Sequence, residues 1–149
     1  MILPILLYNK KNRTILRKIS KNIPRHTNLL KLINNMFKTM YYYNGIGLAA
    51  PQIGININLF VISIRNEKKI FINPSIINYS KSKIISEEGC LSLPNVYIKI
   101  QRYKYILIKT YNIYWEIEFL KLSNMLSIIF QHEFDHLKGK LIIDYIKNN

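Results

Sequence analysis

The sequence predicts an α+β fold in which antiparallel β-sheets pack around a buried C-terminal helix, with another core helix nearer the N-terminus. Apolar residues recur at helical spacing in two stretches, 27–43 and 123–137. The chain between them is rich in isoleucine, valine, phenylalanine and tyrosine, in short runs that turn residues separate, which is typical of antiparallel strands. A length of 149 residues suffices for one core, so we expect a single domain over 1–149.

The first two elements are an arm and a helix. Pro4 and Pro24 interrupt short apolar runs, and we expect residues 1–26 to be an extended arm that wraps the domain. The helix predicted over 27–43 has Thr27 or Asn28 as its cap, and Asn44-Gly45 as its stop.

Residues 45–54, with the letters GIGLAAPQIG, form a loop of small residues that carries one long amide. No strand precedes it and its glycine spacing is wrong for a dinucleotide site. Small residues let backbone approach a ligand closely, so Gln52 could present an N–H donor to a developing oxyanion. The alternative is a tight turn in which Gln52 is satisfied locally.

Strands are expected where β-branched and aromatic residues dominate, with Asn73-Pro74 as a break between two of them. The predicted strands are 58–64, 69–73, 76–86, 96–110 and 113–121. Alternation along the fourth strand places Arg102 on its apolar face. A buried arginine usually has an acidic partner, which Glu88 or Asp135 could supply.

The last helix is predicted to begin after Ser123 and to end at Gly139. Apolar positions surround its two histidines, so we expect the helix to be buried. Residues 141–143 are expected to return as a short strand, and 144–149 to form a tail.

This helix contains the pattern H-E-x-x-H, formed by His132, Glu133 and His136. Residues four apart share a helix face, so both imidazoles can bind one metal ion, while Glu133 lies beside it and can take a proton from a water. The helix is therefore predicted to be metal-binding. The alternative is two helix histidines that are satisfied by ordinary hydrogen bonds.

A catalytic site of this kind needs a third protein ligand and an open position for water. A metzincin would have a third histidine where Ile142 stands, and the only acid after His136 is Asp144, so the ligand is expected upstream. Cys90 is the most informative candidate, because a thiolate binds Zn or Fe(II) strongly. The upstream candidates are His26, Glu67, Glu87, Glu88, Cys90, Glu116 and Glu118.

Composition favours a soluble cytoplasmic protein. A single cysteine cannot form an internal disulfide, which fits a reducing compartment. No apolar run approaches the ~20 residues that span a bilayer, and the apolar N-terminal run is too short for a signal peptide, so no membrane partner is expected.

The formal net charge of +14 raises the question of nucleic acid. The basic residues are scattered, and nothing resembles a recognition helix or an aromatic RNA platform. We interpret the charge as a solvated surface and expect no specific nucleic-acid partner, with weak ribosome contact through this surface as the alternative. The one dense basic stretch comprises Lys10, Lys11, Arg13, Arg17, Lys18 and Lys21.

Three motifs stand in order along the chain: GIGLAAPQIG at 45–54, EEGCLSLP at 87–94 and QHEFDHLKG at 131–139. Together they resemble the G-x-G-x-A-A-x-Q, E-G-C-L-S and H-E-x-D-H signatures of peptide deformylases. Weaker likeness at residues 15–17 and at Arg102 extends the resemblance over most of the chain. The chain departs from the family in the turn at 111–114 and at Ser127, where alanine is common.

The resemblance implies that Cys90, His132 and His136 bind one Fe(II) per chain, for which Zn, Ni or Co could substitute. It implies hydrolysis of the N-formyl group of nascent polypeptides that begin with formyl-methionine, with release of formate. Glu133 would take the proton of the attacking water and pass it to the leaving amine.

The same resemblance implies that Gln52 and the backbone N–H of Leu91 stabilise the tetrahedral oxyanion. Ile46, Gly47 and Gly89 would border the bound peptide. Two other classes remain open: a zinc endopeptidase, which the cysteine ligand argues against, and a non-catalytic basic ribosome-binding protein, which leaves the ligand set unexplained.

Overall fold

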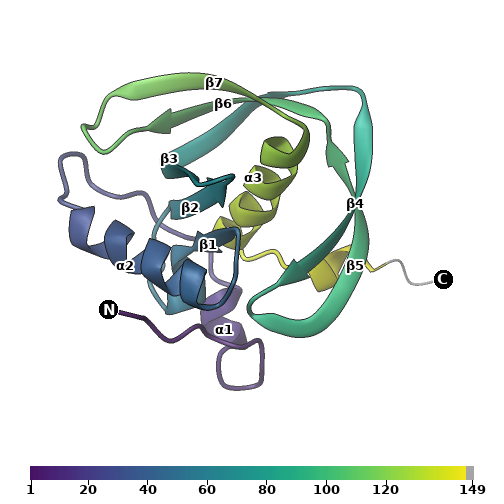
Figure 1. The fold of residues 1–149 in the computed structure, drawn as a ribbon, viewed down its shortest axis with the longest axis horizontal. Helices are drawn as coiled ribbons and strands as arrows, with labels where there is room; N and C mark the ends of the chain where they lie inside the picture. Colours follow the sequence, from purple (N-terminus) through teal and green to yellow (C-terminus); the bar gives the residue numbers. More distant parts are fainter. Residues whose placement is uncertain (147–149) are drawn as a thin grey trace.

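The computed structural model describes residues 1–146 and places two antiparallel sheets around the helix α3 (Asn124–Leu137), as Figure 1 shows. The larger sheet has the strand order β1-β2-β3-β6-β7, and the smaller one pairs β4 with β5. This arrangement confirms the predicted α+β class. The strands are β1 (Gly47–Ala49), β2 (Leu59–Ile64), β3 (Glu67–Tyr79), β4 (Lys83–Cys90), β5 (Leu93–Tyr103), β6 (Tyr105–Tyr111) and β7 (Ile117–Ser123).

Helix α3 packs its apolar side on one face of the five-stranded sheet. The rings of Phe60, Phe71 and Phe130 meet there with centroids 5.0–5.1 Å apart. Burying one such side chain stabilises a fold by roughly 1.5–3 kcal/mol, which anchors the helix against β2 and β3. Ser123 precedes the helix in extended conformation but makes no side-chain capping bond, and Gly139 (φ +72°) follows it as predicted.

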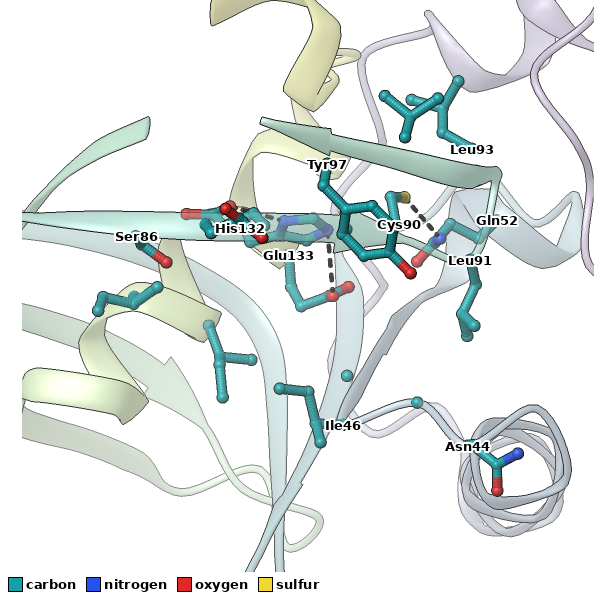
Figure 2. Close-up of a pocket in the computed structure, with 18 of the residues that line it drawn as sticks. Asn44, Ile46, Gln52, Ser86, Cys90, Leu91, Leu93, Tyr97, His132 and Glu133 are labelled. Carbon is teal, nitrogen blue, oxygen red and sulfur yellow. Dashed lines mark hydrogen bonds and ion pairs between the residues drawn. The ribbon is translucent and has the colours of Figure 1, made fainter. Parts of the chain in front are cut away.

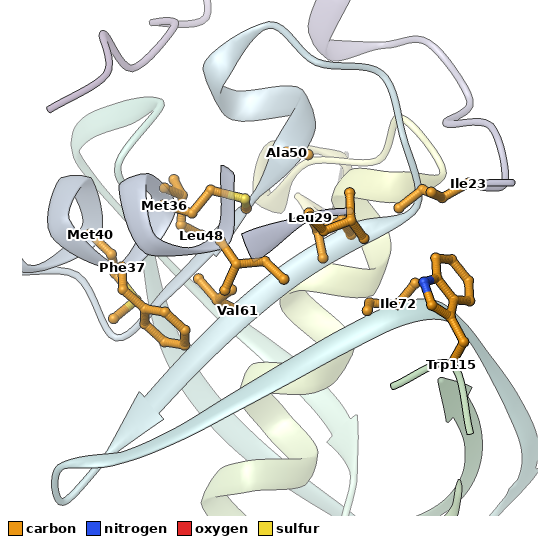
Figure 3. Close-up of a cluster of buried hydrophobic side chains, with 12 residues drawn as sticks. Ile23, Leu29, Met36, Phe37, Met40, Leu48, Ala50, Val61, Ile72 and Trp115 are labelled. Carbon is orange, nitrogen blue, oxygen red and sulfur yellow. The ribbon is translucent and has the colours of Figure 1, made fainter. Parts of the chain in front are cut away.

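Helix α2 (Leu30–Tyr42) covers the opposite face of the same sheet (Figure 3). Its residues Ile33, Met36, Phe37 and Met40 recur at helical spacing and are all buried. The helix begins later than predicted, and the side chain of Asn28 accepts the N–H of Leu30 (3.2 Å) just before its first turn.

Four strand predictions were wrong in detail. The predicted strand 76–86 is divided between the end of β3 and the start of β4, which belong to different sheets. Strand β3 runs unbroken through Asn73-Pro74, where the register shifts and Asn73 has φ +46°, so the proline lies at a bulge instead of a strand end. The predicted strand 96–110 breaks at Lys104, where the chain crosses from the small sheet to the large one. Residues 112–116 form the turn before β7, because the Asn112 side chain accepts N–H bonds from Tyr114 and Glu116.

The N-terminal arm is confirmed and reaches the loops that carry Gln52 and Ser92. Leu6 donates its N–H to the carbonyl of Gln52 (2.7 Å), in the 3-10 helix η1 (Ala50–Ile53), and Tyr8 donates to Ser92 (2.8 Å). A short helix α1 (Arg13–Leu16), which was not predicted, buries Leu16 completely.

The C-terminal prediction was wrong for the residues that the structure describes. Residues 141–143 are not a strand; Ile142–Tyr145 form a 3-10 helix, η2, whose Asp144 accepts the N–H of Leu141 (3.0 Å) and pairs with Arg17. Asp144 and Tyr145 are thus fixed in place, whereas 147–149 of the predicted tail lie outside the described residues. None of the helices in 1–146 has the length and apolar character needed to cross a bilayer.

Candidate metal centre and active site

The three predicted ligands meet at one point. Cys90 ends β4, while His132 and His136 lie one turn apart on α3, and the donor atoms of the three side chains all lie within 4.8 Å of one another. Cys90 Sγ and His136 Nε2 are 3.4 Å apart. Two imidazoles and a thiol in this arrangement can act as three ligands of a four-coordinate ion and leave one position open.

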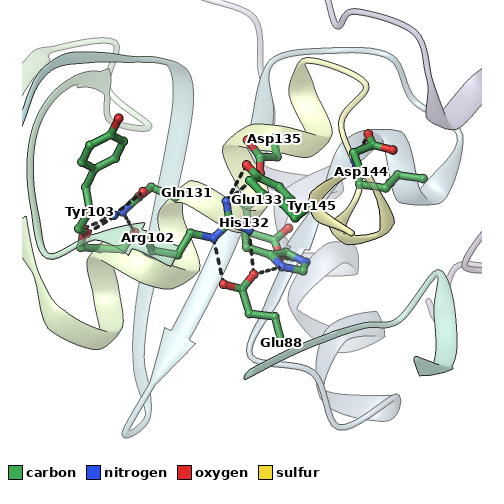
Figure 4. Close-up of polar contacts among 11 residues, drawn as sticks. Glu88, Arg102, Tyr103, Gln131, His132, Glu133, Asp135, Asp144 and Tyr145 are labelled. Carbon is green, nitrogen blue, oxygen red and sulfur yellow. Dashed lines mark hydrogen bonds and ion pairs between the residues drawn. The ribbon is translucent and has the colours of Figure 1, made fainter. Parts of the chain in front are cut away.

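A buried ion pair orients the His132 ring (Figure 4). Arg102 donates to both oxygens of Glu88, at 2.8 and 2.7 Å, and Glu88 Oε1 also lies 2.9 Å from His132 Nδ1. The His132 Nε2 atom is thereby left facing the metal position, which is the usual way that a carboxylate fixes a ligating histidine. Burial alone would raise the pKa of Glu88, but hydrogen bonds with Arg102 and His132 outweigh it and lower the pKa to about 2.

Arg102 uses both predicted acidic partners. Its Nη1 donates to Asp135 Oδ2 (2.7 Å) and to the hydroxyl of Tyr145 (2.9 Å), and that hydroxyl donates to the same Asp135 oxygen (2.6 Å). With Glu88 on its other side, the guanidinium is only 3% exposed and fully paired. The alternation that placed Arg102 on the apolar face of its strand is therefore confirmed.

Gln131 and Ser127 hold α3 against the end of β5. The Gln131 amide accepts the N–H of Tyr103 (3.0 Å) and donates to its carbonyl (2.8 Å), and the Ser127 hydroxyl donates to that carbonyl as well (2.8 Å). These bonds satisfy backbone groups at the point where the chain leaves the small sheet. Ser127, a departure from the family pattern, thus has a structural partner.

Glu133 lies beside the metal position and is almost fully buried, with Oε1 3.8 Å from His132 Nε2. Its Oε2 is buried and makes no hydrogen bond within the described chain. Burial is the main reason that the pKa of Glu133 is raised, to about 7. A carboxylate with this pKa can both accept and donate a proton near neutral pH.

Gln52 is held in one orientation by its own loop and by the loop after Cys90. Its Oε1 accepts the N–H of Ala49 (3.0 Å), and its Nε2 donates to the hydroxyl of Ser92 (3.2 Å). Nε2 also donates to Cys90 Sγ (3.6 Å), so an oxygen near the metal position would take the place of one of these two acceptors. The local bonds do not exclude the predicted oxyanion role.

All but one of the predicted site residues line a single cavity of about 1000 Å³ (Figure 2). His136 is the exception, since it is 1% exposed and does not line the cavity. Among residues 1–146, no lysine or arginine lines the cavity, in contrast to the net charge of the chain. The residues brought together there are Ile46, Gly47, Gln52, Gly89, Cys90, Leu91, His132 and Glu133.

The electrostatics of the three donors fit a bound cation. Burial alone would lower the pKa of His132, but hydrogen bonds with Cys90 and Glu88 and the charge of Glu133 outweigh it and raise the pKa to about 10. The pKa of His136 is instead lowered by burial, which keeps that ring neutral and able to ligate. The unpartnered Glu133 Oε2 is what a water on a divalent ion would satisfy.

Several cavity residues were not identified from the sequence. Met125 and Ile128 share a face of α3 with His132, and their helical spacing is the signal that could have found them. Tyr97, from β5, packs across Gly89 so closely that a Cβ on the glycine would lie 3.0 Å from the ring. Leu7 comes from the arm, and no sequence pattern indicated that the arm reaches the site.

Comparison with known proteins gives one family. The polypeptide deformylase model matches residues 2–149. A peptide deformylase of Karelsulcia muelleri is 46% identical over 98% of this chain and 79% of its own length. The crystal structure of the Thermotoga maritima peptide deformylase is 40% identical, with a TM-score of 0.93 over 99% of both chains. A Met-Ala-Ser-bound class I type b peptide deformylase from Acinetobacter baumannii is 27% identical, with a TM-score of 0.89 over 98% of this chain and 99% of that one.

The family match spans nearly the whole chain, and the relatives agree with it in sequence and in fold. The motifs that suggested the resemblance are the ones that converge on the cavity. The chain belongs to the polypeptide deformylase family, metal-dependent hydrolases that remove the N-formyl group from nascent polypeptides.

Proposed function

We propose that this chain deformylates nascent formyl-methionyl polypeptides at the cavity, with Cys90, His132 and His136 as ligands of one Fe(II) per chain. The observation that carries the proposal is the convergence of one thiol and two imidazoles beside a buried carboxylate with an unpartnered oxygen. Thiolate and imidazole donors suit Fe(II), Zn, Co and Ni alike, and the family resemblance favours Fe(II). When bound, such an ion polarises the formyl carbonyl and lowers the pKa of a coordinated water.

The residues of the chain have distinct proposed roles in the reaction. Glu133 accepts the proton of the attacking water at its free Oε2 and returns it to the amine that leaves as formate departs. Its raised pKa, about 7, suits both steps. Gln52 Nε2 and the backbone N–H of Leu91 donate to the oxygen that becomes negative when the formyl carbon turns tetrahedral.

The peptide is proposed to lie along Ile46, Gly47 and Gly89, which line the cavity. The Acinetobacter baumannii relative was solved with Met-Ala-Ser bound, which supports a short peptide as the ligand. Apolar residues Met125 and Ile128 offer a wall for a methionine side chain, and the absence of cationic groups suits a neutral N-terminal segment.

The catalytic unit is proposed to be a single domain that extends over the whole chain. Support comes from both ends, because Leu6 in the arm binds the carbonyl of Gln52 and Tyr145 in η2 binds Arg102. We further propose that the protein works in the cytoplasm, where its nascent substrates are made.

A weak contact with ribosomal RNA is proposed for the basic surface. Lys104 and Lys121 lie over the ring of Tyr105, and Lys83 lies over that of Tyr103, so three lysines gather beside the link between β5 and β6. Binding of phosphates by such a surface weakens steeply with salt. Cosedimentation with ribosomes that persists unchanged from 50 to ~300 mM salt, or that is absent at 50 mM, would contradict the proposal.

The function is tested with protein purified without oxygen. Formate release is measured with formyl-Met-Ala-Ser and acetyl-Met-Ala-Ser, alongside metal analysis. We expect one metal per chain, activity on the formyl peptide alone, and loss of activity in air because the ion and the Cys90 thiolate are both oxidisable. Comparable kcat/KM for the two peptides would overturn the assignment, and full, air-stable activity of the zinc form would overturn the choice of iron.

A further inference from the structure

We propose that Tyr145 is a positioning residue that fixes the orientation of His132 from the far end of a buried hydrogen-bond chain. Tyr145 touches neither the cavity nor a ligand atom, so its effect on the metal would be transmitted through other side chains. The inference rests on the metal site proposed above.

At the His132 end of this hydrogen-bond network, Arg102 and His132 share one oxygen of Glu88. Glu88 Oε1 lies 2.7 Å from Arg102 Nη2 and 2.9 Å from His132 Nδ1. A rotation of the guanidinium therefore moves the oxygen that the imidazole binds. Because Glu88 is only 7% exposed, no bulk water can replace a lost bond, and the ring orientation depends on where Arg102 holds the carboxylate.

At the Tyr145 end of the network, Asp135 and Tyr145 hold the Arg102 guanidinium on the side away from Glu88. Arg102 Nη1 donates to Asp135 Oδ2 (2.7 Å) and to the Tyr145 hydroxyl (2.9 Å), and this hydroxyl donates to the same Asp135 oxygen (2.6 Å). Three polar atoms thus form a closed triangle, visible in Figure 4. Without the tyrosine oxygen, Nη1 keeps one acceptor and the guanidinium can tilt about it.

The tyrosine itself has little freedom to move. Two cations contact its ring, with the Arg102 guanidinium 4.8 Å and the Lys140 ammonium 4.1 Å from the centroid. The 3-10 helix that carries it is closed by Asp144, which Arg17 of the arm binds. Contacts with the arm and with Arg102 therefore hold residues 141–145, which can act as an anchor for the metal ligand.

A simpler role would be to satisfy a buried arginine, which adds stability without affecting the metal. The two roles differ in a measurable way. A structural role lowers the unfolding temperature of the metal-free protein and leaves metal affinity unchanged. A positioning role accelerates metal release, because a mis-set imidazole binds the ion less well.

The test uses Tyr145→Phe, which removes one oxygen and keeps the ring. Tyr105→Phe is the matched control, because the Tyr105 ring also contacts two cations, the ammonium groups of Lys104 and Lys121 at 5.5 and 5.2 Å, and its hydroxyl makes no hydrogen bond within 1–146. Release of Co(II) from loaded protein to a chelator is followed by absorbance, and metal-free proteins are melted. We expect release roughly threefold to tenfold faster in Tyr145→Phe, below the 10–100-fold typical of direct partners of a ligand, and no change in the control.

The route is tested in a Glu88→Gln background, where the carboxylate link is already broken. Tyr145→Phe should then add little, because the two changes act on one path. Asp135→Asn keeps the tyrosine and weakens the acceptor that Tyr145 and Arg102 share, so it should also accelerate Co(II) release. This variant replaces Tyr145→Phe in the test if Tyr145→Phe folds poorly.

Three results would overturn the inference. If Tyr145→Phe and Asp135→Asn both release Co(II) at the wild-type rate, Tyr145 has no effect on the metal. If the effects of Tyr145→Phe and Glu88→Gln on the release rate are fully additive, the effect does not pass through Glu88. A wild-type chain that takes up no Co(II) overturns the proposed metal site, and this inference with it, so the two failures are distinguishable.

Discussion

A methyl group added at Gly47 tests how the backbone of β1 sets the position of the Glu133 carboxylate. An ideal Cβ at Gly47 would lie 2.8 Å from Glu133 Oε1, 3.0 Å from Cδ and 3.1 Å from Cγ. The carboxylate would have to withdraw by about 0.6 Å to reach an ordinary contact of 3.4 Å. A misplacement of 1 Å can cost on the order of 10²-fold in rate, so we expect kcat of Gly47→Ala to fall roughly tenfold to hundredfold.

The assay is formate release, which gives kcat and KM separately, together with metal analysis. Metal content should stay at the wild-type level, because Gly47→Ala touches the base and none of the three ligands. Glu133→Asp is the companion variant, since its shorter side chain leaves room for the added methyl. The double variant should therefore be no slower than Glu133→Asp alone. Wild-type kcat in Gly47→Ala, or losses that simply multiply in the double variant, would refute the steric reasoning.

Three further predictions concern stability and pH. Gly139→Ala should destabilise the fold far more than Gly54→Ala. Both glycines have positive φ, but a Cβ at Gly139 would clash with the backbone carbonyl of Arg17, whereas a Cβ at Gly54 would have nothing closer than 3.8 Å. Equal thermal midpoints would contradict this. In the folded protein the pKa of Glu88 is about 2, against an ordinary 4.5, so its ionised form stabilises the fold by roughly 3 kcal/mol. This stabilisation is complete above pH 4.5 and is lost as the pH falls toward 2. The urea midpoint of metal-free Glu88→Gln should therefore lack this part of the pH dependence that the wild-type protein shows. Because Glu133 must be deprotonated to accept a proton and a bound cation lowers its pKa, the acid limb of kcat/KM should lie at or below pH 7, and a limb well above pH 7 would exclude this carboxylate as the base.

The fold could be predicted as far as local periodicity allowed. Both long helices were found because their apolar residues recur at helical spacing over several turns. The break at Asn73-Pro74 was wrong because a proline at a bulge and a proline at a strand end have the same local sequence. The crossing at Lys104 and the 3-10 helix at Ile142–Tyr145 depend on contacts with distant segments, which no local pattern contains.

The site was predictable where a motif encodes the chemistry. The spacing of His132 and His136 on one helix face indicated the metal, and the resemblance supplied Cys90 as the third ligand, which the structure places beside them. The pairing of Arg102 was expected from alternation, although the choice between acidic partners was not. Tyr145 could not be predicted, because its partners lie on other elements and its own neighbourhood in the sequence is unremarkable.

The metal stoichiometry of two variants, measured together with kcat, tests the central proposal most directly. Cys90→Ala removes a ligand, so bound metal, activity and thermal stability should fall together. Glu133→Ala leaves all three ligands in place and should keep one metal per chain while kcat falls by ~10²–10⁴-fold. Near-wild-type turnover in Glu133→Ala, or one tightly held metal in Cys90→Ala, would contradict the roles assigned to these residues.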